Sequence, residues 1–179
     1  MSNFQIEEGV LVKYEGNDEN VIIPETVKAI GDQAFLNCCN VKKIVVPATV
    51  KTIGWGAFSS CWDLETLELP FGLKKIPDQM CMGSEKLKDV NIPETVDTIG
   101  SYAFQGCMAL TKVAMPEKVK SIKANAFMSC VNLAELIIPN IEAKICGNAI
   151  AGCAQLTIVA PEGSPAEQLA IKKCSFKKL

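Results

Sequence analysis

Six prolines recur at one fixed interval along this chain of 179 residues. They stand at Pro24, Pro47, Pro70, Pro93, Pro116 and Pro139. The interval of about 23 residues lies in the range that is typical of one structural unit copied end to end. Each unit is too small to bury its apolar side chains alone, whereas stacked copies cover one another. The interval therefore predicts a solenoid before any other residue is considered.

A short strand is expected before each proline. The residues ahead of five of the prolines follow the pattern apolar-x-x-apolar-x-apolar, as in Val41-Lys-Lys-Ile44-Val-Val46. Alternation of this kind indicates a strand with one buried face. Because proline has no amide hydrogen for a sheet ladder, each proline ends its strand. We therefore expect parallel strands about 4.8 Å apart along one side of the coil.

A second signature, Val-x-x-Ile-Gly-x-x-Ala-Phe-x-x-Cys, follows the proline. It is complete at 27–38, 50–61 and 96–107, and it recurs at 119–130 with Lys123 in the glycine position. We expect the glycine to supply a positive φ. The Ala-Phe-x-x-Cys piece is too short for a free helix, so it predicts one helical or 3-10 turn whose phenylalanine fills the core. The predicted fold is an α/β repeat solenoid: a right-handed coil with a parallel sheet on one face and short helical or 3-10 turns on the other.

These units resemble the BspA-like branch of the leucine-rich repeat proteins. The resemblance rests on the combined pattern Ile-x-Leu-Pro-x-x-Val-x-x-Ile-Gly-x-x-Ala-Phe-x-x-Cys and covers roughly residues 20–161. It implies a non-enzymatic, bacterial repeat protein that binds other proteins. For secreted relatives it implies adhesion or binding to host proteins.

The two ends differ from the repeats, so we expect three segments: an N-terminal hairpin cap at 1–20, six repeats at 21–161 and a C-terminal helical cap at 162–179. Alternating apolar residues on either side of Glu8-Gly9 predict the hairpin. Ser164-Pro165-Ala166-Glu167 is a helix-capping sequence. It predicts a helix to about Lys173, with Leu169, Ala170 and Ile171 as the side chains that would contact the last coil.

The third repeat, after Pro70, is irregular. Pro77 replaces the glycine, Met80-Cys81 replaces Ala-Phe, and Ser84 replaces the cysteine. Two interpretations stay open: a local insertion point for a partner, or drift that the core tolerates because Met and Cys fill a similar gap.

Nine cysteines need an explanation, and five of them form one repeat column: Cys38, Cys61, Cys107, Cys130 and Cys153. As a column they are either small buried apolar side chains or partners in disulfides between stacked coils, since Cα atoms one coil apart fall within the required range of about 4.4 to 6.8 Å. The chain has no histidine and no Cys-x-x-Cys pair, which argues against a zinc site. We expect no metal and no cofactor.

Composition excludes several functional classes. A net charge of −2, from 18 lysines, no arginine and 20 acidic residues, indicates no nucleic-acid surface and no bidentate phosphate recognition. The lack of histidine excludes imidazole-based catalysis. The carboxylates fall between the core columns, as solvated surface charges do, so we do not expect the protein to be an enzyme. The sequence contains no apolar run long enough to predict a membrane span. The N-terminal residues do not have the pattern of a signal peptide, which favours the cytosol, or the cell surface if a leader has been removed.

The most promising binding surface is the outward face of the expected sheet. Strand side chains alternate, so two columns point outward. They are Ile22, Val45, Glu68, Asn91, Ala114 and Ile137, and Lys43, Thr66, Asp89, Lys112 and Glu135. Their variation is expected both of a surface adapted to a partner and of an unconstrained surface, but the exposed apolar members favour binding.

The predicted function is a protein–protein interaction module with an unidentified partner. The alternatives are a structural or self-associating repeat protein that forms a homo-oligomer, and a fragment of a bacterial surface adhesin. Trp55, Trp62 and Phe71 are further binding candidates because aromatic residues are favoured at interaction hot spots. Scattered exposed apolar side chains are also ordinary.

Overall fold

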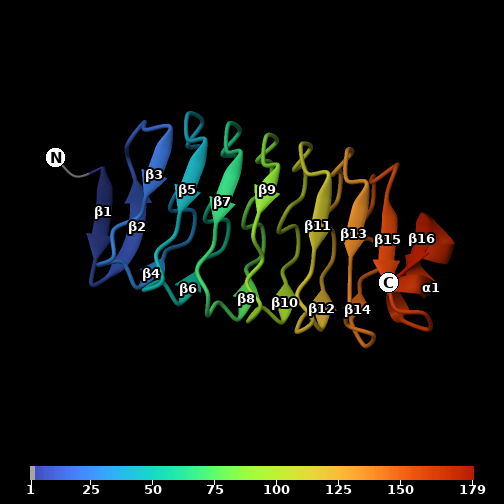
Figure 1. The fold of residues 1–179 in the computed structure, drawn as a ribbon. Coiled ribbons are helices and arrows are strands. Elements are labelled where there is room, and N and C mark those ends of the chain that lie inside the picture. The colour runs from blue at the N-terminus through green and yellow to red at the C-terminus, as the bar shows by residue number, and fades with distance from the viewer. Residues whose placement is uncertain (1–2) are drawn as a thin grey trace.

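Each repeat unit forms one coil of a β-solenoid of about seven turns (Figure 1). The computed structural model of the chain describes residues 3–179. The upper row of strands in Figure 1, the long-strand row, comprises β3 (Asn20–Ile22), β5 (Lys43–Val45), β7 (Thr66–Glu68), β9 (Asp89–Val90), β11 (Lys112–Ala114), β13 (Glu135–Ile137) and β15 (Thr157–Ala160). The lower row, the short-strand row, comprises β4 (Ala29–Ile30), β6 (Thr52–Ile53), β8 (Lys75–Ile76), β10 (Thr98–Ile99), β12 (Ser121–Ile122) and β14 (Lys144–Ile145).

Successive strands pair in parallel and in register. Val21 pairs with Ile44, Ile44 with Leu67 and Leu67 with Val90. Each step along this series is one full repeat, so equivalent residues of successive coils lie side by side. The parallel stacking inferred from the proline interval is confirmed.

The phenylalanine column lies in the core. Phe35, Phe58, Phe104 and Phe127 are all 0% exposed. The ring centroids of Phe35 and Phe58 are 5.3 Å apart, as are those of Phe104 and Phe127. The irregular third repeat separates these two pairs, with both Met80 and Cys81 fully buried. A larger residue in the alanine position and a smaller one in the phenylalanine position keep that layer filled.

The cysteine column is also internal. Cys61, Cys107 and Cys130 are fully buried, and all nine cysteines are free thiols. Each buried thiol of the column donates to a carbonyl of the preceding coil; the Cys130 Sγ, for example, lies 3.0 Å from the Phe104 oxygen. The hydroxyl of Ser84 donates to the Phe58 oxygen at 2.9 Å, so the irregular repeat keeps this hydrogen bond. Burial confirms the interpretation as small core side chains for Cys61, Cys107, Cys130 and Cys153, whereas Cys38 in the first coil is half-buried.

The expected helical or 3-10 turns after the short strands are not confirmed. In these turns, hydrogen bonds to the next coil alternate with local ones. The Phe35 N–H donates to the Ala57 oxygen at 2.8 Å, and the Leu36 N–H donates back to the Gln33 oxygen at 2.9 Å. Positive φ values of 55° at Gln33 and 61° at Asn37 interrupt any helix. Because every second amide is committed to the neighbouring coil, consecutive local hydrogen bonds cannot accumulate.

The reason expected for the glycine column is wrong. Gly54 and Gly100 have no positive φ; the positive values begin two residues later in the coil, as at Gly56. What requires glycine is close contact between coils. A Cβ on Gly100 would lie 2.6 Å from both the backbone nitrogen and the Oδ1 of Asp78. The Asp78 carboxylate accepts a hydrogen bond from the Ser101 N–H at 2.8 Å and so lies directly over Gly100.

The same contact explains where the glycine is dispensable. Asp32 lies over Gly54 in the same way and accepts a hydrogen bond from the Trp55 N–H at 2.7 Å. In the fifth repeat the preceding coil has Ser101 in place of the aspartate, and there Lys123 occupies the glycine position.

Both rows are interrupted near the third repeat. The hydrogen-bonded orders are β3-β5-β7-β9 and β11-β13-β15-β16 in the long-strand row, and β1-β2-β4-β6 and β8-β10-β12-β14 in the short-strand row. Elsewhere in the short-strand row, as at Gly100, the residue after the strand donates its N–H to the preceding coil, here to Ile76 at 2.9 Å. Pro77 stands in this position after β8 and has no N–H. The row therefore separates between β6 and β8.

The chain ends add further elements. At the N-terminus β1 (Phe4–Glu7) pairs antiparallel with β2 (Val10–Tyr14), which pairs in parallel with β4. At the C-terminus α1 (Pro165–Lys173) is followed by β16 (Ser175–Lys178), which pairs in parallel with β15 and was not expected. The division into caps at 1–20 and 162–179 stays a prediction.

The helix begins where expected, but one of its three expected contacts with the last coil is not formed. The Ser164 hydroxyl accepts from the Glu167 N–H at 3.2 Å, and Pro165 is the first helical residue. Leu169 and Ala170 are buried, but Ile171 is 67% exposed. The expectation that Ile171 contacts the last coil is therefore wrong, because a turn of about 100° per residue places it on the solvent side.

Candidate protein-interaction surface

The eleven outward side chains of the two columns are all exposed or half-buried, and the residues between them point inward. On β3, Ile22 is 73% exposed while Val21 is 3% exposed. On β5, Ile44 is fully buried and its neighbours Lys43 and Val45 are half-buried. The alternation of a pleated strand thus holds along the long-strand row.

The register divides these side chains into two patches. Ile22 pairs with Val45 and Val45 with Glu68, while Lys43 pairs with Thr66 and Thr66 with Asp89. In the second sheet, Lys112 pairs with Glu135 and Ala114 with Ile137. Because the described residues show no ladder between β9 and β11, we name two patches. The N-terminal patch is Ile22, Lys43, Val45, Thr66, Glu68, Asp89 and Asn91, and the C-terminal patch is Lys112, Ala114, Glu135 and Ile137.

Ion pairs neutralise much of the charge on both patches. The Lys43 Nζ lies 2.6 Å from Glu68 Oε1, and the Lys112 Nζ lies 2.6 Å from Glu135 Oε1. The hydrogen bond and the charge of Lys112 lower the pKa of the Glu135 carboxyl. A partner would therefore meet apolar side chains flanked by paired charges, with little net charge from these four groups.

Asn91 has a role in holding the fold. Its Oδ1 accepts from the Leu69 N–H at 2.7 Å and its Nδ2 donates to the Leu69 oxygen at 3.0 Å. The side-chain amide thus extends the contact between the β7 and β9 coils beyond Val90, where the strand pairing ends.

Sequence reasoning missed the continuation of the columns beyond Ile137. Thr157 of β15 pairs with Glu135 on one side and with Ser175 of β16 on the other. Val159 of β15 pairs with Lys177 of β16. The signal was present in the alternation of Leu156 and Ile158 ahead of Pro161. No repeat signal marked β16, which follows the helix.

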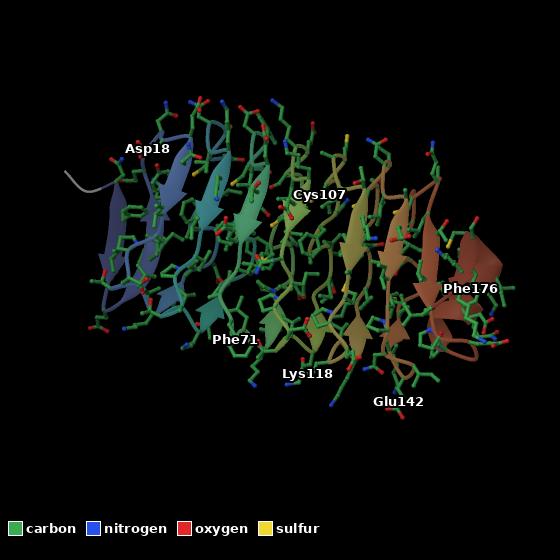
Figure 2. The ribbon with its side chains drawn as sticks, viewed as in Figure 1. Asp18, Phe71, Cys107, Lys118, Glu142 and Phe176 are labelled. Atoms are coloured by element: carbon green, nitrogen blue, oxygen red, sulfur yellow. The ribbon has the colours of Figure 1, made fainter. Side chains whose placement is uncertain are left out.

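The three non-repeat aromatic side chains lie on different segments of the coil. Trp55 follows β6, Trp62 follows the cysteine column, and Phe71 projects at the lower edge of Figure 2. Their exposed fractions are 41%, 53% and 73%. Trp55 lines a hollow beside the short-strand row that neither Trp62 nor Phe71 lines.

Within residues 3–179, no group of three or more His, Cys, Asp or Glu side chains is placed to hold a metal ion. Within the same range, no helix has the length and apolar character needed to cross a bilayer.

The profile of the BspA type Leucine rich repeat region matches residues 12–119 and 74–179, with six copies. A search of curated proteins gave no significant match.

Solved structures with the same fold come from several bacteria. A Treponema pallidum leucine-rich repeat protein is 27% identical, with a TM-score of 0.78 over 93% of this chain and 77% of that one. A Bacteroides ovatus leucine-rich repeat protein is 24% identical, with a TM-score of 0.79 over 92% of this chain and 43% of its own. The pneumococcal vaccine antigen PcpA is 19% identical, with a TM-score of 0.81 over 98% of this chain and 45% of its own. The chain spans less than half the length of the latter two.

Proposed function

The chain belongs to the family of BspA-type leucine-rich repeat proteins, and on this premise we propose that it binds a protein partner through the outward face of the long-strand row. The observation that carries the proposal is the exposed apolar surface of the N-terminal patch. Ile22 is 73% exposed and, on the edge strand β3, pairs with the half-buried Val45. Exposed apolar surface on a rigid face is a common mark of an interaction site.

The stacked core supplies the rigidity that such a surface needs. Ile44 and Leu67, directly behind the patch, are fully buried and paired in register. A face held in this way loses little conformational freedom on binding, which favours affinity. Specificity comes from the side chains that vary from coil to coil. The repeat fold is generally a scaffold without catalytic activity, and the proposal involves no chemical step.

The partner is reached at a bacterial surface. One protein of similar fold, from Faecalibacterium prausnitzii, is described as a leucine rich cell surface protein, which supports the cell surface over the cytosol that the N-terminal residues predicted. The test is surface labelling of intact cells that produce the full protein with an epitope tag. Labelling only after lysis would contradict this part of the proposal.

The binding face is tested with a matched pair of variants. Ile22→Ser/Val45→Ser removes the apolar centre of the N-terminal patch, whereas Ile141→Ser removes an apolar side chain that is 54% exposed outside both patches. Proteins captured by the wild type are identified by mass spectrometry, and their dissociation constants are measured with purified components. We expect the double variant to bind at least about tenfold more weakly and the Ile141 variant to bind normally. Equal effects of the two would contradict the proposed face.

Self-association is the second candidate, because Ile22 lies on β3, an edge strand of the four-stranded sheet. Light scattering over a range of concentrations separates the two. A dimer that Ile22→Ser/Val45→Ser dissociates supports a contact between copies. A monomer at all concentrations rules that contact out.

A further inference from the structure

The lysines of this chain fall into two environments. The seven ion pairs within residues 3–179 leave out every lysine on or beside the six short strands β4, β6, β8, β10, β12 and β14. Those lysines are all exposed: Lys28, Lys51, Lys74, Lys75, Lys120, Lys123 and Lys144. Although the net charge of the chain is −2, this row carries positive charge that no ion pair compensates in the described part of the chain.

Three of these lysines border two hollows that share a wall. The first hollow has a volume of about 310 Å³ and is lined by Trp55, Lys75 and Lys123, among others. The second has a volume of about 450 Å³ and is lined by Lys123, Ser121 and Lys144. Since Lys123 lines both, the two hollows adjoin, and the second is shallow; we call the surface they form together the groove, and it follows the short-strand row seen in Figure 1.

The register fixes the spacing of the cations in this groove. Lys75 pairs with Thr98, Thr98 with Ser121, and Ser121 with Lys144. Three strand spacings therefore separate Lys75 from Lys144, a distance of about 14 Å along the stack. The groove suits an extended chain with anionic groups at intervals.

The groove also contains an aromatic surface and hydrogen-bond acceptors. Trp55 is 41% exposed, and its backbone N–H is held by Asp32 Oδ1 at 2.7 Å. Asp32, Asp78 and Thr98 line the same hollow as Trp55 and Lys75. An aromatic ring packs against an apolar ligand face, while the neighbouring lysines donate hydrogen bonds and the carboxylates accept them.

We propose that the short-strand row binds an acidic polysaccharide in this groove, with Trp55 against the apolar face of one sugar ring and Lys75, Lys123 and Lys144 against its sulfate or carboxylate groups. A sugar chain matches the mixture of donors and acceptors, because each hydroxyl both donates and accepts. The backbone of a single-stranded DNA carries phosphates but no hydroxyl along its length, so it lacks this match, and a single-stranded oligothymidylate tests that alternative.

This groove differs from the surface proposed for a protein partner, so an experiment can contradict either proposal and leave the other standing. The probe is a fluorescein-labelled heparin oligosaccharide, which carries both sulfate and carboxylate groups. Binding is measured by fluorescence anisotropy at several salt concentrations. Neutral dextran, poly-L-glutamate and a single-stranded oligothymidylate are the comparison ligands.

Two triple variants remove the same charge from different faces. Lys75→Gln/Lys123→Gln/Lys144→Gln alters the groove, and Lys42→Gln/Lys86→Gln/Lys88→Gln alters exposed lysines that form ion pairs elsewhere. We expect the groove variant to weaken heparin binding by about tenfold or more and to flatten its salt dependence, because fewer counterions are released. The control variant should change the affinity for heparin by less than about twofold.

Trp55→Ala tests the sugar contact separately from charge. It should weaken binding by about fivefold with an unchanged salt dependence, and Trp55→Phe should retain most of the affinity. The proposal is overturned if heparin does not bind, if both triple variants act equally, or if poly-L-glutamate or the oligothymidylate binds as tightly as heparin. The last outcome would indicate attraction of any polyanion or of another class of macromolecule.

Discussion

Replacing Gly100 with alanine is the most direct test of the contact between coils. An added Cβ would lie 2.6 Å from the Asp78 nitrogen, the Asp78 Oδ1 and the Pro77 carbonyl carbon. Two of these three atoms are backbone and cannot rotate away, so the two coils must separate locally. Overpacking of this kind typically costs about 1–3 kcal/mol. Because Gly100 has no positive φ, the smaller entropy of an unfolded alanine offsets only about 0.4–1 kcal/mol of that cost. The expected net loss is about 1–2 kcal/mol.

Gly147 provides the matched control. No atom lies within 4 Å of the Cβ position at Gly147, and its φ is not positive. Gly147→Ala should therefore leave the free energy of unfolding unchanged or raise it by less than about 1 kcal/mol. The measurement is urea denaturation followed by circular dichroism, with the m-value compared among variants.

A double variant separates the two kinds of contact. Asp78→Ala/Gly100→Ala removes the clash with Oδ1 and leaves the clash with the backbone nitrogen of residue 78, so we expect it to remain less stable than Asp78→Ala alone. If Gly100→Ala were as stable as the wild type, or equal to Gly147→Ala, the explanation of the glycine column by coil contact would be refuted.

Further outcomes follow from the core. Phe104→Ala should lose about 3–5 kcal/mol of unfolding free energy, because the ring is fully buried and stacked on Phe127. Phe71→Ala should change that free energy by less than about 0.5 kcal/mol, as is usual at an exposed position. Denaturant melts compare the two, and similar values would contradict the placement of the ring column in the core. Cys107→Ser should stay within about 1 kcal/mol of the wild type, since a hydroxyl can keep the hydrogen bond to the Cys81 oxygen as Ser84 does for Phe58. Cys107→Val should lose up to about 1 kcal/mol more, because the Cys81 oxygen then keeps only its hydrogen bond from the Ser84 N–H at 3.1 Å; the reverse order would exclude a role for the side-chain hydrogen bond. Burial raises the pKa of Cys130 to about 12 and that of Cys153 to about 11, from an ordinary 9.0. Their neutral form is thus favoured in the folded state, so the stabilisation is complete below about pH 9 and declines as the pH rises toward about 11–12, where unfolded thiols are already ionised. Urea midpoints should fall between about pH 8 and about pH 10.5, and a midpoint that rose over this range would contradict the burial.

The candidate face illustrates how far sequence reasoning reaches. The outward position of Ile22, Val45 and their equivalents follows from strand alternation alone, and the structure leaves these side chains exposed or half-buried. The division into two patches could not be foreseen. It depends on the missing ladder between β9 and β11, which the residues ahead of Pro93 and Pro116 do not mark, since both follow the strand pattern. The groove beside Trp55 was likewise hidden, because its lining comes from several coils.

By itself the sequence determined the period, the strand register and the burial of the phenylalanine and cysteine columns. A strict repeat places equivalent letters at equivalent points in space, so an apolar column must become a row of the core. Only the tertiary structure decided why Gly54 and Gly100 are glycines, why the turns are not helical, and that the short-strand row separates at Pro77 and the long-strand row between β9 and β11. These features depend on how closely neighbouring backbones approach and on which amide each carbonyl meets across the gap. Such distances are properties of two coils in contact, and no single repeat records them.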